Sequence, residues 1–167
     1  INGVHRSILK TEKQDYRIVF LNRLQEKTPD IKFDIYGINK VQPIWADHYF
    51  KTISNAKMGL NLSRGEAIKY YSSDRITQIV GNGLVCLIDE KTSYRDFFSD
   101  TEMVFYKNEN DLSEKILKIS RDEKLRKSIA KKGKNKYMKY FNSTLVAKFI
   151  LEKTLGIKSK NKYFWHN

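Results

Sequence analysis

The sequence predicts an α/β fold in which a parallel β-sheet carries helices on both faces. Segments with strand-like and helix-like apolar spacing alternate from Gln14 to Tyr106, and this order is typical of a parallel sheet. The run Leu84–Ile88 is continuously apolar, as in a strand that is buried on both faces. The turn Gly81-Asn82-Gly83 separates this run from the helix predicted before it, because glycine tolerates the left-handed conformation that ends a helix.

Four elements are predicted before residue 63. Gln14–Thr28 has apolar residues at helical spacing and is followed by a proline, which stops the helix. Ile31–Tyr36 alternates apolar and polar side chains, which predicts a strand. Asp47–Ala56 is then expected as a short helix and Met58–Leu62 as a short strand.

The middle of the chain continues the alternation. Ser73–Val80 is predicted to be a helix, because Ser72, Ser73 or Asp74 can cap its first turn. The strand Leu84–Ile88 follows the glycine turn. Thr92–Phe98 has the length of one or two helical turns, and Glu102–Tyr106 is expected as a further strand.

The last third of the chain is predicted to be helical. Asp111-Leu-Ser-Glu114 has the spacing of a capping box, which predicts a helix start there. A long helix is expected over Asp122–Phe141, interrupted or kinked at Gly133, and a final helix from Asn142. These are extra helices beyond the sheet. Residues 1–157 are expected to form one domain, and residues 158–167 a basic, aromatic tail that is loose, as chain ends usually are.

Composition limits the function classes. The chain has 167 residues and a net charge of +13, so that nucleic acid, an anionic membrane or a phosphorylated small molecule are candidate partners. The basic residues are spread over the predicted helices and not gathered in one block, which favours an ordinary solvated surface as the alternative. The single cysteine, Cys86, excludes a disulfide within one chain and fits a cytoplasmic compartment. The sequence has no apolar run long enough to cross a bilayer.

The loop Ser63–Ser73 is the strongest candidate site. It is long and polar, and it leads into a predicted helix start, where free backbone N–H groups and the helix dipole favour phosphate. Arg64, Lys69 and Arg75 lie in or just after this loop, and an arginine fork matches phosphate oxygens. The alternative for Arg75 is an ordinary surface ion pair with a neighbouring carboxylate.

Other site chemistries find little support. The three histidines, His5, His48 and His166, lack metal-ligand spacing, so that no metal is expected. The sequence contains no P-loop, no GxGxxG after a strand and no Asp-x-Asp pair. A glycosyltransferase of the metal-diphosphate kind is therefore not expected.

Four stretches in series resemble the C-terminal domain of GT-B glycosyltransferases, which has a Rossmann-like parallel sheet. The resemblance is closest to the "glycosyl transferases group 1" relatives that include spore-maturation-type proteins, and it spans about residues 1–155. The stretches are Lys57–Arg64 (KMGLNLSR), Asp74–Asp89 (DRITQIVGNGLVCLID), Asp96–Tyr106 (DFFSDTEMVFY) and Leu125–Tyr140 (LRKSIAKKGKNKYMKY).

This resemblance implies a function and a set of binding residues. The donor would be a nucleoside-diphosphate sugar, with no further cofactor, and its diphosphate would meet the region from Ser63 through Arg64 and Ser73 to Arg75. Family members carry a ribose-binding glutamate where this chain has Gln78, which brings a hydrogen bond but no charge. Glu66 corresponds to an earlier acidic residue that faces the sugar.

The resemblance also bears on the limits of the chain. Ile1–His5 is similar to the glycine loop after the domain's first strand, which makes Gly3 a donor-binding candidate. The first strand is then expected largely before residue 1, and an acceptor-binding domain before that. Because part of the catalytic group would come from that domain, we expect little transfer by the isolated chain.

Two other classes remain as alternatives. A basic nucleic-acid-binding module would need aromatic side chains that stack on bases, and the aromatics in Tyr137–Phe141 fall at helical spacing, which favours core packing. A receiver-like signalling domain would need an acidic cluster that the sequence lacks. The tail Lys158–Trp165 combines cations with aromatic residues, so that a peripheral contact with an anionic membrane is a further expectation.

Overall fold

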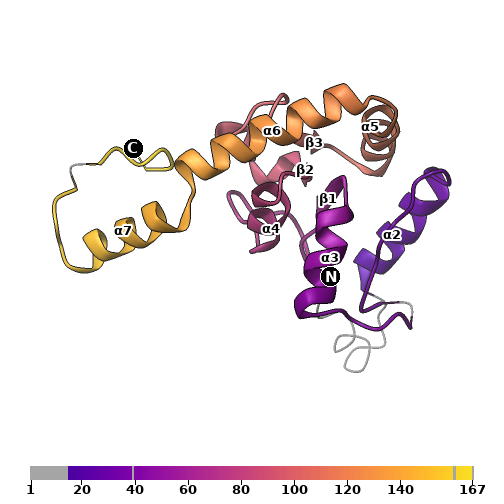
Figure 1. Cartoon of the computed structure of the whole chain (residues 1–167), viewed down its shortest axis with the longest axis horizontal. Helices are drawn as coiled ribbons and strands as arrows, with labels where there is room; N and C mark the ends of the chain where they lie inside the picture. Colours follow the sequence, from indigo (N-terminus) through magenta and orange to yellow (C-terminus); the bar gives the residue numbers. More distant parts are fainter. Residues whose placement is uncertain (1–14, 39, 160, 167) are drawn as a thin grey trace.

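The computed structural model describes residues 15–38, 40–159 and 161–166. Helices and strands alternate along the first two thirds of this part, and helices follow (Figure 1). The elements are α2 (Tyr16–Lys27), α3 (Ala46–Asn55), β1 (Met58–Asn61), α4 (Arg75–Gly81), β2 (Val85–Asp89), the short 3-10 helices η1 (Glu90–Thr92) and η2 (Tyr94–Asp96), β3 (Val104–Tyr106), α5 (Glu109–Arg121), α6 (Glu123–Tyr140) and α7 (Ser143–Thr154).

The sheet confirms the predicted α/β fold. Its three strands are all parallel in the order β1-β2-β3, with Met58 opposite Val85 and Leu87 opposite Val104. Side chains of β2 alternate between two core clusters, so that Val85 and Leu87 pack on one face of the sheet, and Cys86 and Ile88 on the other. α2 and α5 contribute to the first cluster and α4 to the second, so that helices cover both faces.

Ile31–Tyr36 is not a strand, which corrects the sequence prediction. The structure describes this segment as irregular chain, and no strand pairs with the outer side of β1 within the described residues. The apolar alternation has another cause. Ile31 and Phe33 pack against one core cluster and Ile35 against another. Alternate side chains are therefore partly buried, as in a strand, although the segment forms no hydrogen-bonded ladder.

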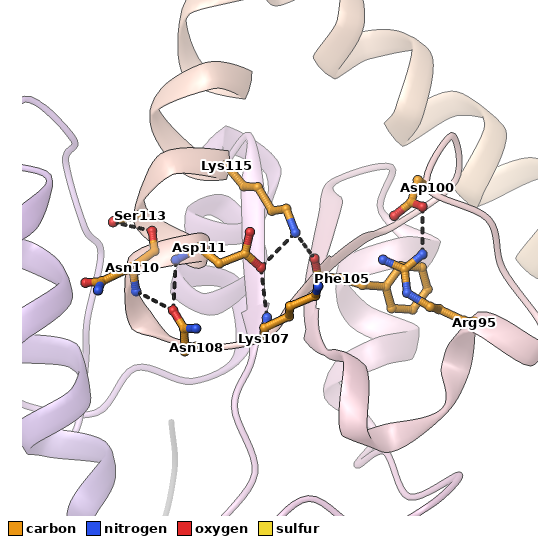
Figure 2. Close-up of polar contacts among 9 residues, drawn as sticks. All are labelled: Arg95, Asp100, Phe105, Lys107, Asn108, Asn110, Asp111, Ser113 and Lys115. Carbon is orange, nitrogen blue, oxygen red and sulfur yellow. Dashed lines mark hydrogen bonds and ion pairs between the residues drawn. The ribbon is translucent and has the colours of Figure 1, made fainter.

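The α5 start also differs from the prediction. Asn108, and not Asp111, is the N-cap, because its side chain accepts from the backbone N–H groups of Asn110 and Asp111 (Figure 2). Asp111 instead accepts from the Lys107 N–H at 2.8 Å, and its carboxylate pairs with Lys115. Asp111 lies three residues after the N-cap, as the acidic residue of a capping box does, but it accepts from the N–H one residue before the N-cap.

The long helix α6 runs unbroken through Gly133, where an interruption or a kink was predicted. A Cβ atom on Gly133 would lie 2.3 Å from the carbonyl oxygen of Glu102, so that glycine is needed for close approach. Lys134 lies beside Gly83. Glu102 and Gly83 precede β3 and β2, so α6 passes the amino-terminal edge of the sheet.

The C-terminal segment packs on α6 and α7, and the prediction of a loose tail is wrong for its described residues. Tyr163 is buried and its hydroxyl donates to Glu152 at 2.7 Å. The rings of Phe164 and Trp165 lie 5.9 and 5.5 Å from the ring of Phe141. Phe141 and Tyr137 pack against the second core cluster, which confirms that these α6 aromatics are packing residues.

Candidate functional site

A cavity of about 450 Å³ lies at the carboxyl edge of the sheet. The last residue of each strand lines it, namely Asn61 of β1, Asp89 of β2 and Tyr106 of β3. We call this cavity the carboxyl-edge pocket. Ligands of open α/β sheets bind at this edge, because the loops that follow the strands converge there. Among the described residues the lining consists of Tyr16, Asn61, Leu62, Ser63, Gly65, Glu66, Ala67, Asp89, Lys91, Thr92 and Tyr106.

The β1 side of the pocket contains polar atoms without partners. Asn61 is only 4% exposed and its amide N–H donates to Ser72 Oγ at 3.0 Å. Its Oδ1 atom and the Nε atom of Arg75 are buried and have no hydrogen-bond partner among the described residues. Buried polar atoms are nearly always satisfied, so these two exceptions, one on Asn61 of the lining and one on Arg75 next to Leu62 of the lining, call for a partner such as a water or a polar ligand.

Arg75, on α4, supports the β1 side of the pocket. It is the first residue of that helix, it is half-buried, and its Nη2 atom donates to the Leu62 carbonyl at 2.8 Å. Burial, and then the charge of nearby Arg17, lowers the pKa of Arg75 from its ordinary value. The guanidinium therefore places a positive charge behind the β1 end of the pocket. In the described part of the chain it makes no ion pair with Asp74 or Glu66.

The start of α2 closes another side. Asp15 caps the helix and binds the Arg17 guanidinium through two hydrogen bonds, at 3.0 and 2.7 Å. This pairing with Arg17 holds the pKa of Asp15 below its usual value. The hydroxyl of Tyr16 donates to the Ser63 carbonyl at 2.9 Å, so α2 is tied to the loop after β1. Burial raises the pKa of Tyr16 above its ordinary value.

A tight turn after β2 presents a lysine to the pocket. Asp89 caps η1 by accepting from the Lys91 N–H at 2.9 Å, and the Thr92 hydroxyl donates to the Asp89 carbonyl at 2.6 Å. The Thr92 carbonyl then accepts from the backbone N–H of Tyr70, which fastens the long loop after β1 across the turn. Lys91 is exposed and lines the pocket, where its ammonium group can meet an anion.

The sequence-predicted residues separate into three groups. Ser63 and Glu66 line the pocket, and Arg64 is exposed on the same loop without lining it. Ser73 and Arg75 lie at the start of α4, where Ser73 Oγ accepts from the Arg75 N–H at 3.4 Å. Gln78, in the middle of α4, does not line the pocket.

Gln78 is engaged elsewhere. Its side chain accepts from the Tyr49 hydroxyl and donates to Asp74 at 3.3 Å, which ties α4 to α3. Gly3 lies outside the described residues. Sequence reasoning missed Tyr16, Asn61, Asp89, Lys91 and Tyr106. Three of these end strands, so the rule that ligands bind at carboxyl ends could have found them.

Other chemistries lack a site in the described residues. Nowhere in residues 15–38, 40–159 and 161–166 do three His, Cys, Asp or Glu side chains group as a metal site requires. Cys86 is buried in β2, and this burial raises the pKa of its thiol to about 12, so it is not a nucleophile at neutral pH.

Comparison with known protein families supports one activity. The model of a family described as glycosyl transferase-like matches residues 15–152. This range covers every residue that lines the carboxyl-edge pocket and includes α7 up to Glu152. Comparison with curated proteins and with solved structures found no match.

Proposed function

Because the chain belongs to the glycosyl transferase-like family, we propose that its carboxyl-edge pocket binds a nucleoside-diphosphate sugar whose sugar is transferred to an acceptor. The observation that carries the proposal is the convergence of the three strand ends on one polar cavity of about 450 Å³. A cavity of this size suits a small-molecule ligand, for which pockets span about 300–1,000 Å³.

The lining offers partners for the hydroxyl groups and for the diphosphate of such a donor. Glu66 and Asp89 are carboxylates, which accept hydrogen bonds from sugar or ribose hydroxyls. Lys91 is the cation among the described lining residues, and Arg75 adds positive charge next to Leu62 on the β1 side. During transfer the bond from the anomeric carbon to the diphosphate breaks, the acceptor oxygen bonds to that carbon, and the acceptor's proton leaves to a base. The cations favour this step because they stabilise negative charge on the departing diphosphate.

The remaining features of the proposal rest on the resemblance to GT-B enzymes. The pocket would be the donor half of a two-domain site, with the acceptor held by another domain and the reaction taking place in the cytoplasm during polysaccharide synthesis. Ser63, Arg64, Glu66, Ser73, Arg75 and Gln78 remain the donor-binding candidates, with Gln78 reaching the ribose only if it releases Tyr49. Donor binding by the isolated chain with little transfer is the expected behaviour.

Ligand binding tests the proposal. Uridine and guanosine diphosphates, their sugar conjugates and a mixed oligonucleotide are titrated against the protein while its melting temperature is recorded. We expect a saturable rise with a diphosphate, because a ligand at 100 times its Kd adds about 2.7 kcal/mol to stability. A rise with the oligonucleotide alone would instead support a nucleic-acid-binding module and overturn the proposal.

A charge variant locates the binding within the molecule. Lys91→Ala should weaken diphosphate binding by about 1–2 kcal/mol, because it removes a charged contact at an exposed rim. Lys124→Ala is the matched control, since Lys124 is an exposed lysine on α6, which crosses the opposite edge of the sheet. Equal affinities of the two variants in calorimetric titration would place the diphosphate away from Lys91.

A further inference from the structure

Helix α7 turns its acidic residue inward. Glu152 is 9% exposed, and its carboxylate accepts from the Tyr163 hydroxyl and from the Asn161 amide. Phe149 lies on the same side, with its ring 5.0 Å from that of Tyr163 and 6.0 Å from that of Trp165. The inner side of α7 therefore holds the C-terminal segment, and the two form an extension at one end of the molecule (Figure 1).

The outer side of α7 is apolar and uncovered. An α-helix has about 3.6 residues per turn, which places Val146, Ala147, Ile150 and Leu151 on the side opposite Glu152. Ile150 is 55% exposed, Leu151 is 59% exposed, and Leu155 and Ile157 continue the strip at 65% and 55%. We call these six residues the α7 apolar face. Residues Ser143, Thr144 and Thr154 complete this side, which carries no charge between its borders.

This arrangement is the reverse of a usual surface helix. A helix of a globular protein turns its apolar side to the core, and a continuous exposed apolar strip marks a surface that contacts something else. A shallow hollow of about 530 Å³ lies along the same side and is lined by Ser143, Thr144, Ala147, Lys148 and Leu151. All five belong to α7, so the hollow is an open surface of this helix.

The charges at the borders of the face are all positive. Lys148 and Lys153 lie on α7 between its apolar and inner sides, one at each border, and both are exposed. Residues 142–167 contain five lysines, no arginine or aspartate, and Glu152 as their one acidic residue. Because Glu152 is held inward, this end of the molecule presents apolar side chains framed by cations.

These observations favour a lipid surface over a protein partner. The helix presents lysines and no exposed carboxylate, so the charge that complements it is anionic, as in a layer of phosphate headgroups. Apolar residues framed by lysines are the pattern with which a helix lies in the surface of an anionic membrane.

We propose that α7 binds anionic membranes by inserting its apolar face among the lipid headgroups, with Lys148 and Lys153 at the level of the phosphates. The contact is peripheral, because none of the described helices is long and apolar enough to cross a bilayer. It also differs from a contact through the tail Lys158–Trp165, because Tyr163 and Trp165 pack against Phe149.

Vesicle flotation of the full chain tests the proposal. We expect flotation with vesicles of phosphatidylcholine and phosphatidylglycerol, and none with phosphatidylcholine alone. Ile150→Ser/Leu151→Ser should lower the partition by roughly ten-fold or more, because it removes two inserted side chains. Ile68→Ser is the matched control, since Ile68 is 63% exposed in the loop after β1, and it should float like the parent.

Matched lysine variants separate a defined contact from general attraction by the net charge of +13. Lys148→Gln/Lys153→Gln should reduce flotation several-fold more than Lys131→Gln/Lys132→Gln, whose lysines are exposed on α6. Equal losses from the two lysine pairs, together with no effect of Ile150→Ser/Leu151→Ser, would overturn the proposal, because adsorption would then depend on net charge alone.

A fluorescent label reports insertion directly. Cys86 is buried, so Ile150→Cys can be labelled selectively with an environment-sensitive dye, and Ser54→Cys at the end of α3 serves as the control. We expect a blue shift on anionic vesicles for the label at residue 150 and none for the label at residue 54. A dimer in sedimentation that Ile150→Ser/Leu151→Ser dissolves, with vesicle binding unchanged, would assign the face to a second copy and overturn the proposal.

Discussion

Arg75 and Asn61 determine the character of the pocket at the scale of single residues. Each has one polar group that is satisfied within the protein and one buried atom without a partner among the described residues. Such atoms cost free energy in the folded state unless a ligand or water meets them. A polar ligand or a water that met these two atoms would therefore add to the stability of the folded protein.

Arg75 is the residue whose substitution is most informative. Arg75→Ala should weaken nucleoside-diphosphate binding by about 1.5–3 kcal/mol, the usual worth of a hydrogen bond to a charged group. It should also lower stability somewhat, because the bond to the Leu62 carbonyl is lost. Arg75→Lys should recover only part of the affinity, since lysine lacks the guanidinium fork.

Calorimetric titration well below the melting temperature compares these variants, and Arg121→Ala, an exposed arginine at the end of α5, is the control. If Arg75→Ala binds the nucleotide as tightly as the parent, Arg75 only fastens α4 to β1.

At the scale of elements, α6 depends on one close approach. Gly133 lies within an 18-residue helix, where alanine would ordinarily be about 1 kcal/mol more favourable. Here the glycine lets the helix axis approach the backbone just before β3, because an added Cβ atom would be 2.3 Å from the Glu102 carbonyl oxygen. The packing requirement therefore overrides the helix propensity.

We predict that Gly133→Ala lowers the free energy of unfolding by about 1–3 kcal/mol, the usual range for overpacking a tight contact. Gly81→Ala is the matched control in a helix. A Cβ atom there would be 3.6 Å from Met138 Cε, an ordinary contact, so that change should be neutral or slightly stabilising. Urea unfolding measures both variants. An equal stability of the two would show that the Glu102 backbone moves away without cost.

At the scale of the whole molecule, the two edges of the sheet have different roles. α6 covers the amino edge and is fastened there by Lys136, whose Nζ atom lies 3.0 Å from the Glu102 carboxylate. The carboxyl edge carries the pocket. Rigid packing at one edge thus supports the loops that form the site at the other, which is the usual division of roles in open α/β sheets.

The Glu102 carboxylate should make global stability depend on pH. Burial raises its pKa, but hydrogen bonds from Ser99 and Lys136 outweigh this effect and hold the pKa below its ordinary value. The stabilisation is therefore complete above about pH 4.3, the ordinary glutamate pKa, and disappears as pH falls through the folded-state value.

Glu102→Gln should lower the free energy of unfolding by about 1 kcal/mol at pH 7. At a pH below the folded-state pKa of Glu102 the change should have almost no effect, because the parent carboxylate is then protonated and has lost the same interaction. Unfolding by urea at a series of pH values measures the difference. Glu114→Gln, an exposed glutamate on α5, is the control. If Glu102→Gln lowers the free energy of unfolding by the same amount at every pH, the carboxylate has no ionic role in stability.

The sequence by itself determined the fold class and most elements, because these depend on local periodicity and on residues that end helices. The buried run at residues 84–88 and the glycine turn before it were enough to place a parallel strand with helices on both faces. The loop after β1 could also be chosen as the candidate site, since its polar residues precede a helix start.

Only the tertiary structure decided which side chains share the pocket and which way the last helix faces. Asn61, Asp89 and Tyr106 are far apart along the chain, and only the parallel register brings their ends together. The periodicity of residues 31–36 could not reveal that no strand lies beside them. α7 has apolar residues on two sides, so the contact of the segment that follows it, through the bond from Tyr163 to Glu152, decides which side stays exposed.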